Sequence, residues 1–231
     1  MLQVYQAMTA IRSRPAMPRP GAIQCGNLAM MSDHYFSAQP GSSHKRRELR
    51  VVLAGQERLL QTDSGIFSPD GVDKGTAVLL AGAPAPAEAG NLLDIGCGWG
   101  PIALSLALHS PNATVYAVDV NERSLGLTAD NAAALGLANL RTGLPEQIDA
   151  TLQFQTIWSN PPIRVGKEVL HGILHTWLPR LAPDGSAYLV VQKNLGSDSL
   201  QRWLAETFPE LEVARHSTAK SFRILQVHRP A

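Results

Sequence analysis

Short apolar runs alternate with amphipathic stretches over most of the chain after residue 90. Strand-like runs fall at 91–95, 113–118, 155–158 and 186–192, and helical patterns at 101–109, 122–135, 167–181 and 198–208. Buried strands that alternate with helices are typical of a parallel sheet covered on both faces. The pattern therefore predicts an α/β, doubly wound fold whose ligands bind at the carboxyl ends of the strands.

Antiparallel elements are expected at both ends of this region. Two strand-like runs flank Ala54 and Gly55, which favours an N-terminal β-hairpin, and "DKGTAVLLAG" can form a short helix after it. The last runs, "LEVARHS" and "SFRILQVHR", are expected to pair as antiparallel strands. With a third strand that ends near Gly143, we expect a mostly parallel seven-stranded sheet with an antiparallel C-terminal strand.

The first 30 residues differ from the rest of the chain. They are rich in Pro, Arg, Met and Ala without periodicity, which predicts a disordered leader. "MSDHYFSAQP" from Met31 resembles a natural start. The expected organisation is a leader at 1–30, a hairpin-and-helix segment at 31–89 that packs on the core, and a catalytic domain at 90–231.

Composition limits the class of protein. With 231 residues and 45% hydrophobic side chains, the chain can bury one sizeable core. No apolar run approaches the roughly 18 residues of a membrane span, and the leader lacks the apolar segment of a secretory signal. Cys25 and Cys97 do not form a disulfide framework. We therefore expect a cytoplasmic protein without membrane contact.

Positive charge is concentrated near the start. Residues 1–50 hold seven Lys and Arg against two acidic residues (7 − 2 = +5), and the rest hold thirteen against seventeen (13 − 17 = −4). A basic cluster can contact phosphates, although a run as short as 44–50 is more often a solvated surface.

The segment "NLLDIGCGWGPIALSLA" carries the first chemical motif. A strand ends at Asp94, and Gly96, Gly98 and Gly100 follow before a helix. Glycines allow a tight turn and a close approach to a ligand. Their spacing differs from the dinucleotide pattern G-x-G-x-x-G and favours S-adenosylmethionine, whose ammonium group Asp94 can receive. The alternative is a glycine-rich turn without a ligand.

Asp119 ends the next strand. Its carboxylate can accept hydrogen bonds from both hydroxyls of a ribose that lies across the sheet. The alternative is a helix cap, but Asn121 directly precedes the helical run and suits that role better.

The segment "SNPPIR" follows the strand at 155–158. Two prolines restrict the backbone and remove N–H donors, so the Pro161 carbonyl is predicted to be a free acceptor beside the Asn160 side-chain oxygen. Two such acceptors can hold an amide-like or aromatic NH₂ group. The alternative is a turn that only terminates the strand.

Together these motifs resemble the class I S-adenosylmethionine-dependent methyltransferases that modify amines. The flanking segments "GIFSPDGVDKGTAVLL", "SNPPIRVGKEVLH" and "VVQKNLGSDSL" resemble the small-domain ribosomal RNA guanine-N2 methyltransferase family, over roughly residues 34–228. The resemblance implies methyl transfer to an exocyclic base amine, most simply guanine N2 of small-subunit ribosomal RNA. It implies S-adenosylmethionine as cofactor, ribosomal RNA or the small subunit as partner, and no metal.

The resemblance also assigns roles to residues. The cofactor residues are Phe67, Ser68, Asp94, Gly96, Cys97, Gly98, Gly100, Asp119, Val120, Gly143 and Leu144; the catalytic residues are Asn160, Pro161 and Pro162; the substrate residues are Ile163, Arg164 and Lys167. Two positions depart from the family. Ile163 stands where many relatives have an aromatic residue that stacks on the base, and Gly143 stands where an acidic or amide residue often binds the adenine amino group.

Other functions use the same motifs. Protein glutamine-N5 and adenine-N6 methyltransferases share the Asn-Pro-Pro arrangement, and a non-catalytic RNA-binding assembly factor can have the same fold. His171 and His175 have a spacing that can bind metal, but no third ligand accompanies them, so we expect no metal site.

Overall fold

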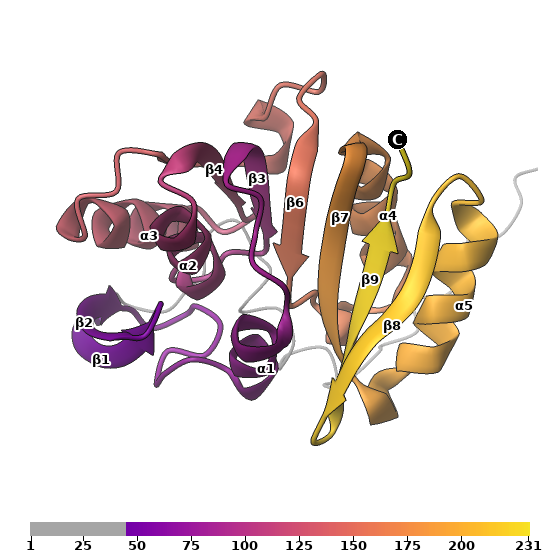
Figure 1. Ribbon diagram of the computed structural model, residues 1–231. Coiled ribbons are helices and arrows are strands. Elements are labelled where there is room, and N and C mark those ends of the chain that lie inside the picture. Colours follow the sequence, from indigo (N-terminus) through magenta and orange to yellow (C-terminus); the bar gives the residue numbers. More distant parts are fainter. Residues whose placement is uncertain (1–44) are drawn as a thin grey trace, which may run out of the picture.

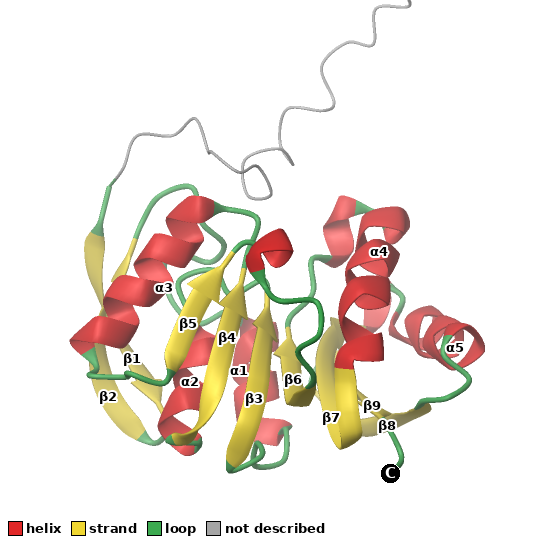
Figure 2. Ribbon diagram, turned by 90° about the horizontal axis from the view of Figure 1, so that it is seen from above, coloured by secondary structure: helices red, strands yellow, loops and turns green. Residues whose placement is uncertain are grey.

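The computed structural model describes residues 45–231, and a seven-stranded sheet with helices on both faces forms its centre (Figure 1, Figure 2). Its strands are β3 (Ala89–Ile95), β4 (Asn112–Val118), β5 (Leu140–Gly143), β6 (Phe154–Ser159), β7 (Leu181–Gln192), β8 (Glu212–Ala219) and β9 (Phe222–His228). Their order is β5-β4-β3-β6-β7-β9-β8, and β9 runs antiparallel to both its neighbours. The predicted fold class is confirmed.

Five α-helices accompany the strands within the described residues. They are α1 (Lys74–Gly82), α2 (Pro101–His109), α3 (Glu122–Ala134), α4 (Lys167–Trp177) and α5 (Ser197–Thr207). The prediction that α4 continues to residue 181 is wrong, because a 3-10 turn at Leu178–Arg180 follows it. Pro179 has no N–H for the helical ladder and its ring obstructs the preceding turn. The strand β7 therefore begins at Leu181, before the predicted start at 186.

Apolar side chains fill the space between the sheet and the helices on each face. Leu174 of α4 and Leu204 of α5 belong to one buried cluster, and Leu79 of α1 and Leu106 of α2 belong to a second. Strands that are buried on both faces have nearly continuous apolar sequences, as the central strands do here. The sheet is thus a rigid support for the loops at its carboxyl edge.

The N-terminal hairpin packs against one end of this assembly. Its strands are β1 (Arg47–Leu53) and β2 (Gln56–Thr62), joined through Ala54 and Gly55, both with positive φ. Two such residues give the turn that suits the twist of a hairpin. Asn131 of α3 bonds the Gln61 backbone, accepting from its N–H at 2.7 Å and donating to its carbonyl at 2.9 Å.

The predicted leader at 1–30 lies outside the described residues, and the domain boundary at 89/90 stays a prediction. Within residues 45–231, no helix is both long and apolar enough to span a bilayer.

Candidate functional site

The glycine turn lies between β3 and α2. Gly96, Gly98 and Gly100 have φ values of 79°, 58° and 100°, which lie in the left-handed region that favours glycine. The N–H groups of Gly96 and Cys97 donate to the Val118 carbonyl at 2.8 and 3.0 Å and so tie the turn to the end of β4. A Cβ on Gly96 would meet no atom within 4 Å, so a ligand can approach this backbone closely.

Asp94 lies beneath the turn and is fully buried. Its Oδ2 accepts a hydrogen bond from the Ala103 N–H at 3.0 Å, in the first turn of α2, while its Oδ1 has no partner within the described residues. Burial raises the pKa of Asp94 well above its usual value; the Ala103 N–H opposes this shift and the charge of Asp119 adds to it. A buried carboxylate oxygen without a partner is unfavourable, and a ligand ammonium group would satisfy it.

Asp119 directly follows β4. Its Oδ2 accepts from the Gly98 N–H at 3.0 Å, and its Oδ1 accepts from the Asn121 N–H at 2.9 Å. Burial raises the pKa of Asp119, and these N–H groups lower it. Each carboxylate oxygen can accept a further hydrogen bond, so two hydroxyl groups can still be held. Asn121 caps α3 by accepting from the Arg123 N–H at 3.0 Å, as predicted.

A loop from the N-terminal segment covers the turn. The Trp99 Nε1–H donates to the Ser68 carbonyl at 3.2 Å, and Phe67 beside it is 48% exposed. Phe67, Ser68 and Trp99 border a cleft. The residues that line this cleft are Phe67, Ser68, Asp73, Thr76, Gly96, Cys97, Gly98, Trp99, Pro101, Ile102 and Asn160. The structure therefore brings the predicted glycine turn and the predicted catalytic asparagine to the same cleft.

Asn160 directly follows β6, and its side-chain NH₂ group is held from the start of α1. The Asn160 Nδ2 donates to Asp73 Oδ2 at 2.9 Å and to Thr76 Oγ1 at 3.1 Å. Asp73 is also the N-cap of α1, because its Oδ2 accepts from the Gly75 N–H at 2.7 Å. Sequence reasoning missed both partners. Asp73 was recognisable at most as a helix cap, and nothing in the sequence indicated its contact with Asn160.

The prediction of a free carbonyl at Pro161 is wrong. This carbonyl accepts a hydrogen bond from the Ile163 N–H at 2.9 Å. After Pro162 the chain turns at once into a short 3-10 helix, Ile163–Val165, and its first N–H points back. A carbonyl has a second lone pair, so Pro161 can still act as an acceptor in addition to this bond.

The three predicted substrate residues have different surroundings. Ile163 packs against the buried cluster below α4, whereas Arg164 and Lys167 are exposed.

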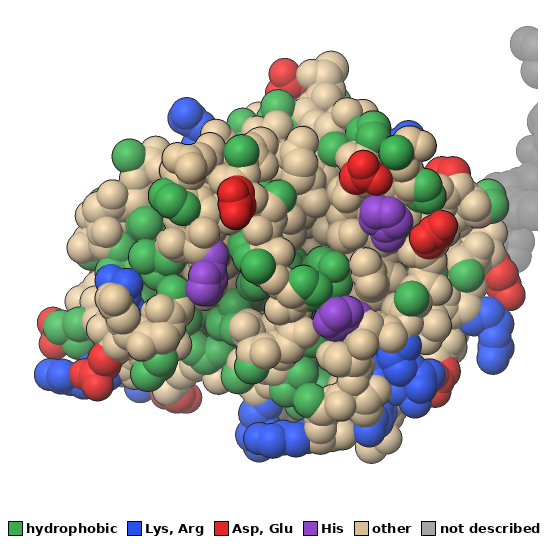
Figure 3. Space-filling model, viewed as in Figure 1, with side chains coloured by type: hydrophobic (Ala, Val, Ile, Leu, Met, Phe, Trp, Pro, Cys, Tyr) green, Lys and Arg blue, Asp and Glu red, His purple; other side chains and the backbone are tan. Residues whose placement is uncertain are grey.

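The β8–β9 turn lies beside the carboxyl end of β7, because the Lys193 N–H donates to the Ser221 carbonyl at 2.8 Å. In Figure 3, Lys and Arg side chains gather in the lower part of the view, below α1 and beside that turn.

The remaining predicted cofactor residues lie at the same edge of the sheet. Gly143 ends β5 and is buried against Ile148, Leu144 is half-buried, and Val120 is 44% exposed beside Asp119. Cys97 is buried, and burial raises the pKa of its thiol, as do the charges of Asp119 and Asp94. The thiol therefore stays protonated and contributes to packing. The roles of these residues remain predictions.

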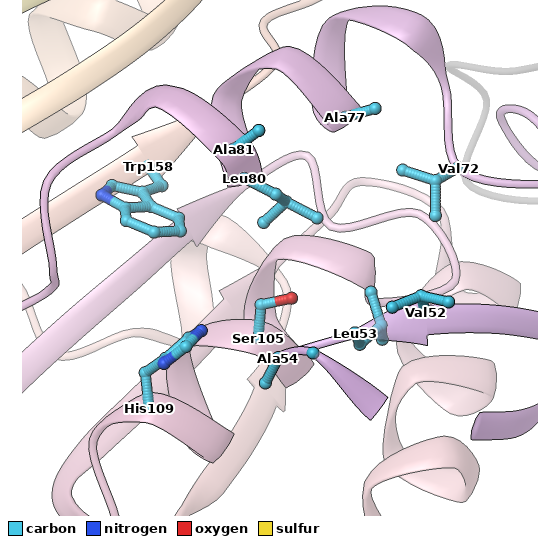
Figure 4. A pocket seen from close by; sticks show the side chains of 11 residues that line it. Val52, Leu53, Ala54, Val72, Ala77, Leu80, Ala81, Ser105, His109 and Trp158 are labelled. Atoms are coloured by element: carbon cyan, nitrogen blue, oxygen red, sulfur yellow. The ribbon is translucent and has the colours of Figure 1, made fainter. Parts of the chain in front are cut away.

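A second hollow, of about 320 Å³, lies between the hairpin, α1 and α2 (Figure 4). Its walls are mostly aliphatic, with Ser105, His109 and Trp158 among its lining residues, and none of its lining residues borders the cleft. The Ser105 hydroxyl already donates to the Pro101 carbonyl.

Among residues 45–231, no group of three His, Cys, Asp or Glu side chains could hold a metal ion. His171 instead stacks on Trp203, with ring centres 3.6 Å apart.

Known proteins resemble this chain in sequence and in fold. YbxB of Bacillus subtilis is 36% identical over 188 residues, which cover 80% of this chain and 94% of YbxB. Ribosomal RNA small subunit methyltransferase C of Aeromonas hydrophila is 36% identical over 120 residues, which cover 52% of this chain and 34% of that protein.

The solved structure of a T. thermophilus 16S rRNA N2 methyltransferase (RsmC), in complex with AdoMet and guanosine, shares the fold. Its TM-score is 0.66 at 24% identity, over 83% of this chain and 52% of that one. The present chain thus spans about half the length of this structure and about a third of the A. hydrophila enzyme. Residues 57–226 match the family described as Methyltransferase small domain, which agrees with the predicted cofactor, S-adenosylmethionine. The chain belongs to the Methyltransferase small domain family.

Proposed function

We propose that this chain transfers a methyl group from S-adenosylmethionine to an exocyclic amine of a nucleobase, guanine N2 in small-subunit ribosomal RNA. The observation that carries the proposal is the position of Asn160 in the cleft of the glycine turn. Its NH₂ group is occupied by Asp73 and Thr76, so its oxygen is the atom left for a substrate amine. An amide oxygen that accepts an amine N–H leaves the nitrogen lone pair available for the reaction.

Residues of the glycine turn and beside it suit the proposed cofactor. Asp94 has an unpartnered buried oxygen for the ammonium group, Asp119 has acceptor capacity for the ribose hydroxyls, and the backbone at Gly96 is open to close approach. When bound, the cofactor supplies a methyl group on a positively charged sulfur, a strong electrophile. The protein therefore contributes mainly by positioning the amine.

The proton balance requires no dedicated base. Asn160 accepts one N–H of the amine and orients the nitrogen. With the cofactor bound, a nitrogen–carbon bond would form as the sulfur–carbon bond breaks, and the methylated nitrogen would lose a proton to water. Asn160 is an acceptor that holds its substrate and does not itself change protonation.

Basic side chains near the cleft favour RNA over a protein substrate. Arg164 and Lys167 follow the Asn-Pro-Pro segment, Lys74 begins α1 next to Asp73, and Lys193 lies where β7 ends. Within the described residues these four side chains form no ion pair, so they are available to phosphates. The A. hydrophila relative is named as a ribosomal RNA methyltransferase, which supports the same substrate class.

One experiment separates an RNA substrate from a protein substrate and from a non-catalytic role. The purified chain is incubated with methyl-labelled S-adenosylmethionine and ribosomal RNA or small subunits from cells that lack the gene, and the label is counted in the RNA and protein fractions. We expect label in the 16S RNA. Label in protein would favour glutamine methylation instead. Cofactor binding without any transfer would favour an assembly factor.

A further inference from the structure

The amide of Asn160 is held on one side only. Its Nδ2 donates hydrogen bonds to Asp73 Oδ2 at 2.9 Å and to Thr76 Oγ1 at 3.1 Å. Within the described residues, its Oδ1 accepts no hydrogen bond. We propose that Asp73 and Thr76 are positioning residues that fix the orientation of this amide, so that its oxygen and never its NH₂ group faces the substrate amine. This inference rests on the proposed function.

The chemistry of an amide makes such control necessary. A half-turn about the last side-chain bond exchanges the oxygen and the NH₂ group with little change in shape, and it replaces an acceptor by a donor. A donor facing a substrate amine would repel it. Asp73 prevents the exchange because a carboxylate only accepts hydrogen bonds, and the flipped amide would place two oxygens at 2.9 Å.

Gly75 provides the space in which the oxygen lies. A Cβ at this position would be 3.3 Å from Asn160 Oδ1, 3.0 Å from Asp73 Oδ2 and 3.1 Å from Phe222 Cε1. Three residues of one short segment therefore surround the Asn160 amide. Asp73 supplies a carboxylate acceptor, Gly75 leaves space for the oxygen, and Thr76 supplies a hydroxyl. In the same segment, Asp73 starts α1 by capping it.

The two roles of Asp73 can be separated by substitution. Serine caps a helix about as well as aspartate does, but its oxygen lies closer to the backbone and cannot reach Asn160. Asp73→Ser therefore keeps the start of α1 and removes the contact. Asp73→Asn keeps both, with a weaker neutral hydrogen bond. Asp70→Ser is the matched control, because it removes an exposed carboxylate three residues away that pairs only with Arg47 among the described residues.

The first test measures the amide directly, without any activity. In an ¹⁵N–¹H spectrum, the Asn160 NH₂ signals are assigned by their loss in Asn160→Ala. We expect slow solvent exchange of these protons in the parent, in Asp70→Ser and in Asp73→Asn. Asp73→Ser should exchange at least about tenfold faster, since a hydrogen bond to a charged group is lost. Asn194 is exposed and serves as the reference; exchange in the parent as fast as that of Asn194 would overturn the inference.

The second test asks whether methylation depends on this orientation. It measures the single-turnover rate of RNA methylation in each variant. Rates should fall in the order parent, Asp73→Asn, Asp73→Ser, with the last at least about tenfold below the parent and with unchanged cofactor affinity. In an Asn160→Ala background, Asp73→Ser should cause no further loss. Parental rates in Asp73→Ser, or an equal loss in both backgrounds, would refute the role. A parent that methylates no RNA would refute the proposed function instead, while the exchange measurement still decides the amide orientation.

Discussion

The two halves of the cleft are built by different means. The cofactor half is built around the consecutive residues Gly96 to Gly100, in which the three glycines have positive φ angles and backbone bonds to Val118 hold the turn, and it includes Asp94 and Asp119. The amine half consists of side chains from separate elements, since Asn160 contacts Asp73 from 87 residues away. The positive φ angles of the three glycines are a property of local backbone conformation, whereas the contact between Asn160 and Asp73 exists only after the tertiary fold has formed.

This difference predicts how each half fails. Damage to the cofactor half should appear as weaker binding, because its groups are predicted to contact parts of the cofactor that do not react. Damage to the amine half should appear as a slower rate at unchanged cofactor affinity, because its groups are proposed to act on the reacting nitrogen. The following substitutions test this separation, from the largest expected effect to the smallest.

Asn160→Ala should lower the single-turnover methylation rate by about two orders of magnitude or more, as loss of one preorganised polar contact typically does. Calorimetric affinity for S-adenosylmethionine should remain at the parental value. If Asn160 only terminates a strand, the variant would be less stable but would react at a normal rate per folded molecule.

Asp119→Ala should weaken S-adenosylmethionine binding by about 1.5 to 3 kcal/mol, through loss of charge-assisted hydrogen bonds to the ribose. Calorimetric titration measures the change. The rate at saturating cofactor should fall much less than the affinity. Unchanged affinity would remove Asp119 from the cofactor site.

The comparison also explains what the sequence could predict. The sheet, its helices and the glycine turn leave periodic or local signals, and they agree with the structure. The end of α4 was misplaced because apolar periodicity continues past Trp177, although Pro179 already marked a boundary. The partners of Asn160 left no local signal, because a hydrogen bond between distant side chains depends on packing alone.

Asp94→Asn should raise the stability of the ligand-free protein at neutral pH by about 1 kcal/mol and weaken cofactor binding. The raised pKa of Asp94 means that its ionisation opposes folding, so its contribution to stability falls as pH rises from the unfolded pKa through the folded one. Asparagine keeps an acceptor for the Ala103 N–H and avoids the buried charge.

The advantage of Asp94→Asn in thermal unfolding should therefore shrink as pH falls below the raised pKa of Asp94 in the folded protein toward its pKa in the unfolded chain. A variant that is less stable than the parent at every pH on both sides of that raised pKa would show that Asp94 stabilises the fold as a charged group.

Two glycines in helices should respond differently to alanine. Gly126 lies in α3, where a Cβ would meet no atom within 4 Å, so Gly126→Ala should stabilise the protein by about 0.5–1 kcal/mol with an unchanged rate. Gly75→Ala presses on Asn160 and Asp73, so it should show less or no gain in stability and a reduced rate. Equal rates for the two variants would indicate that the amine half tolerates displacement.

The central claim is that the amine half accepts guanine N2, and nucleoside mass spectrometry tests it most directly. Small-subunit RNA from cells that lack the gene is treated with the protein and S-adenosylmethionine, then digested to nucleosides. We expect N2-methylguanosine to appear with the parent and to be nearly absent with Asn160→Ala. A methyl group on adenine N6, on a ribose or on no nucleoside at all would contradict the account.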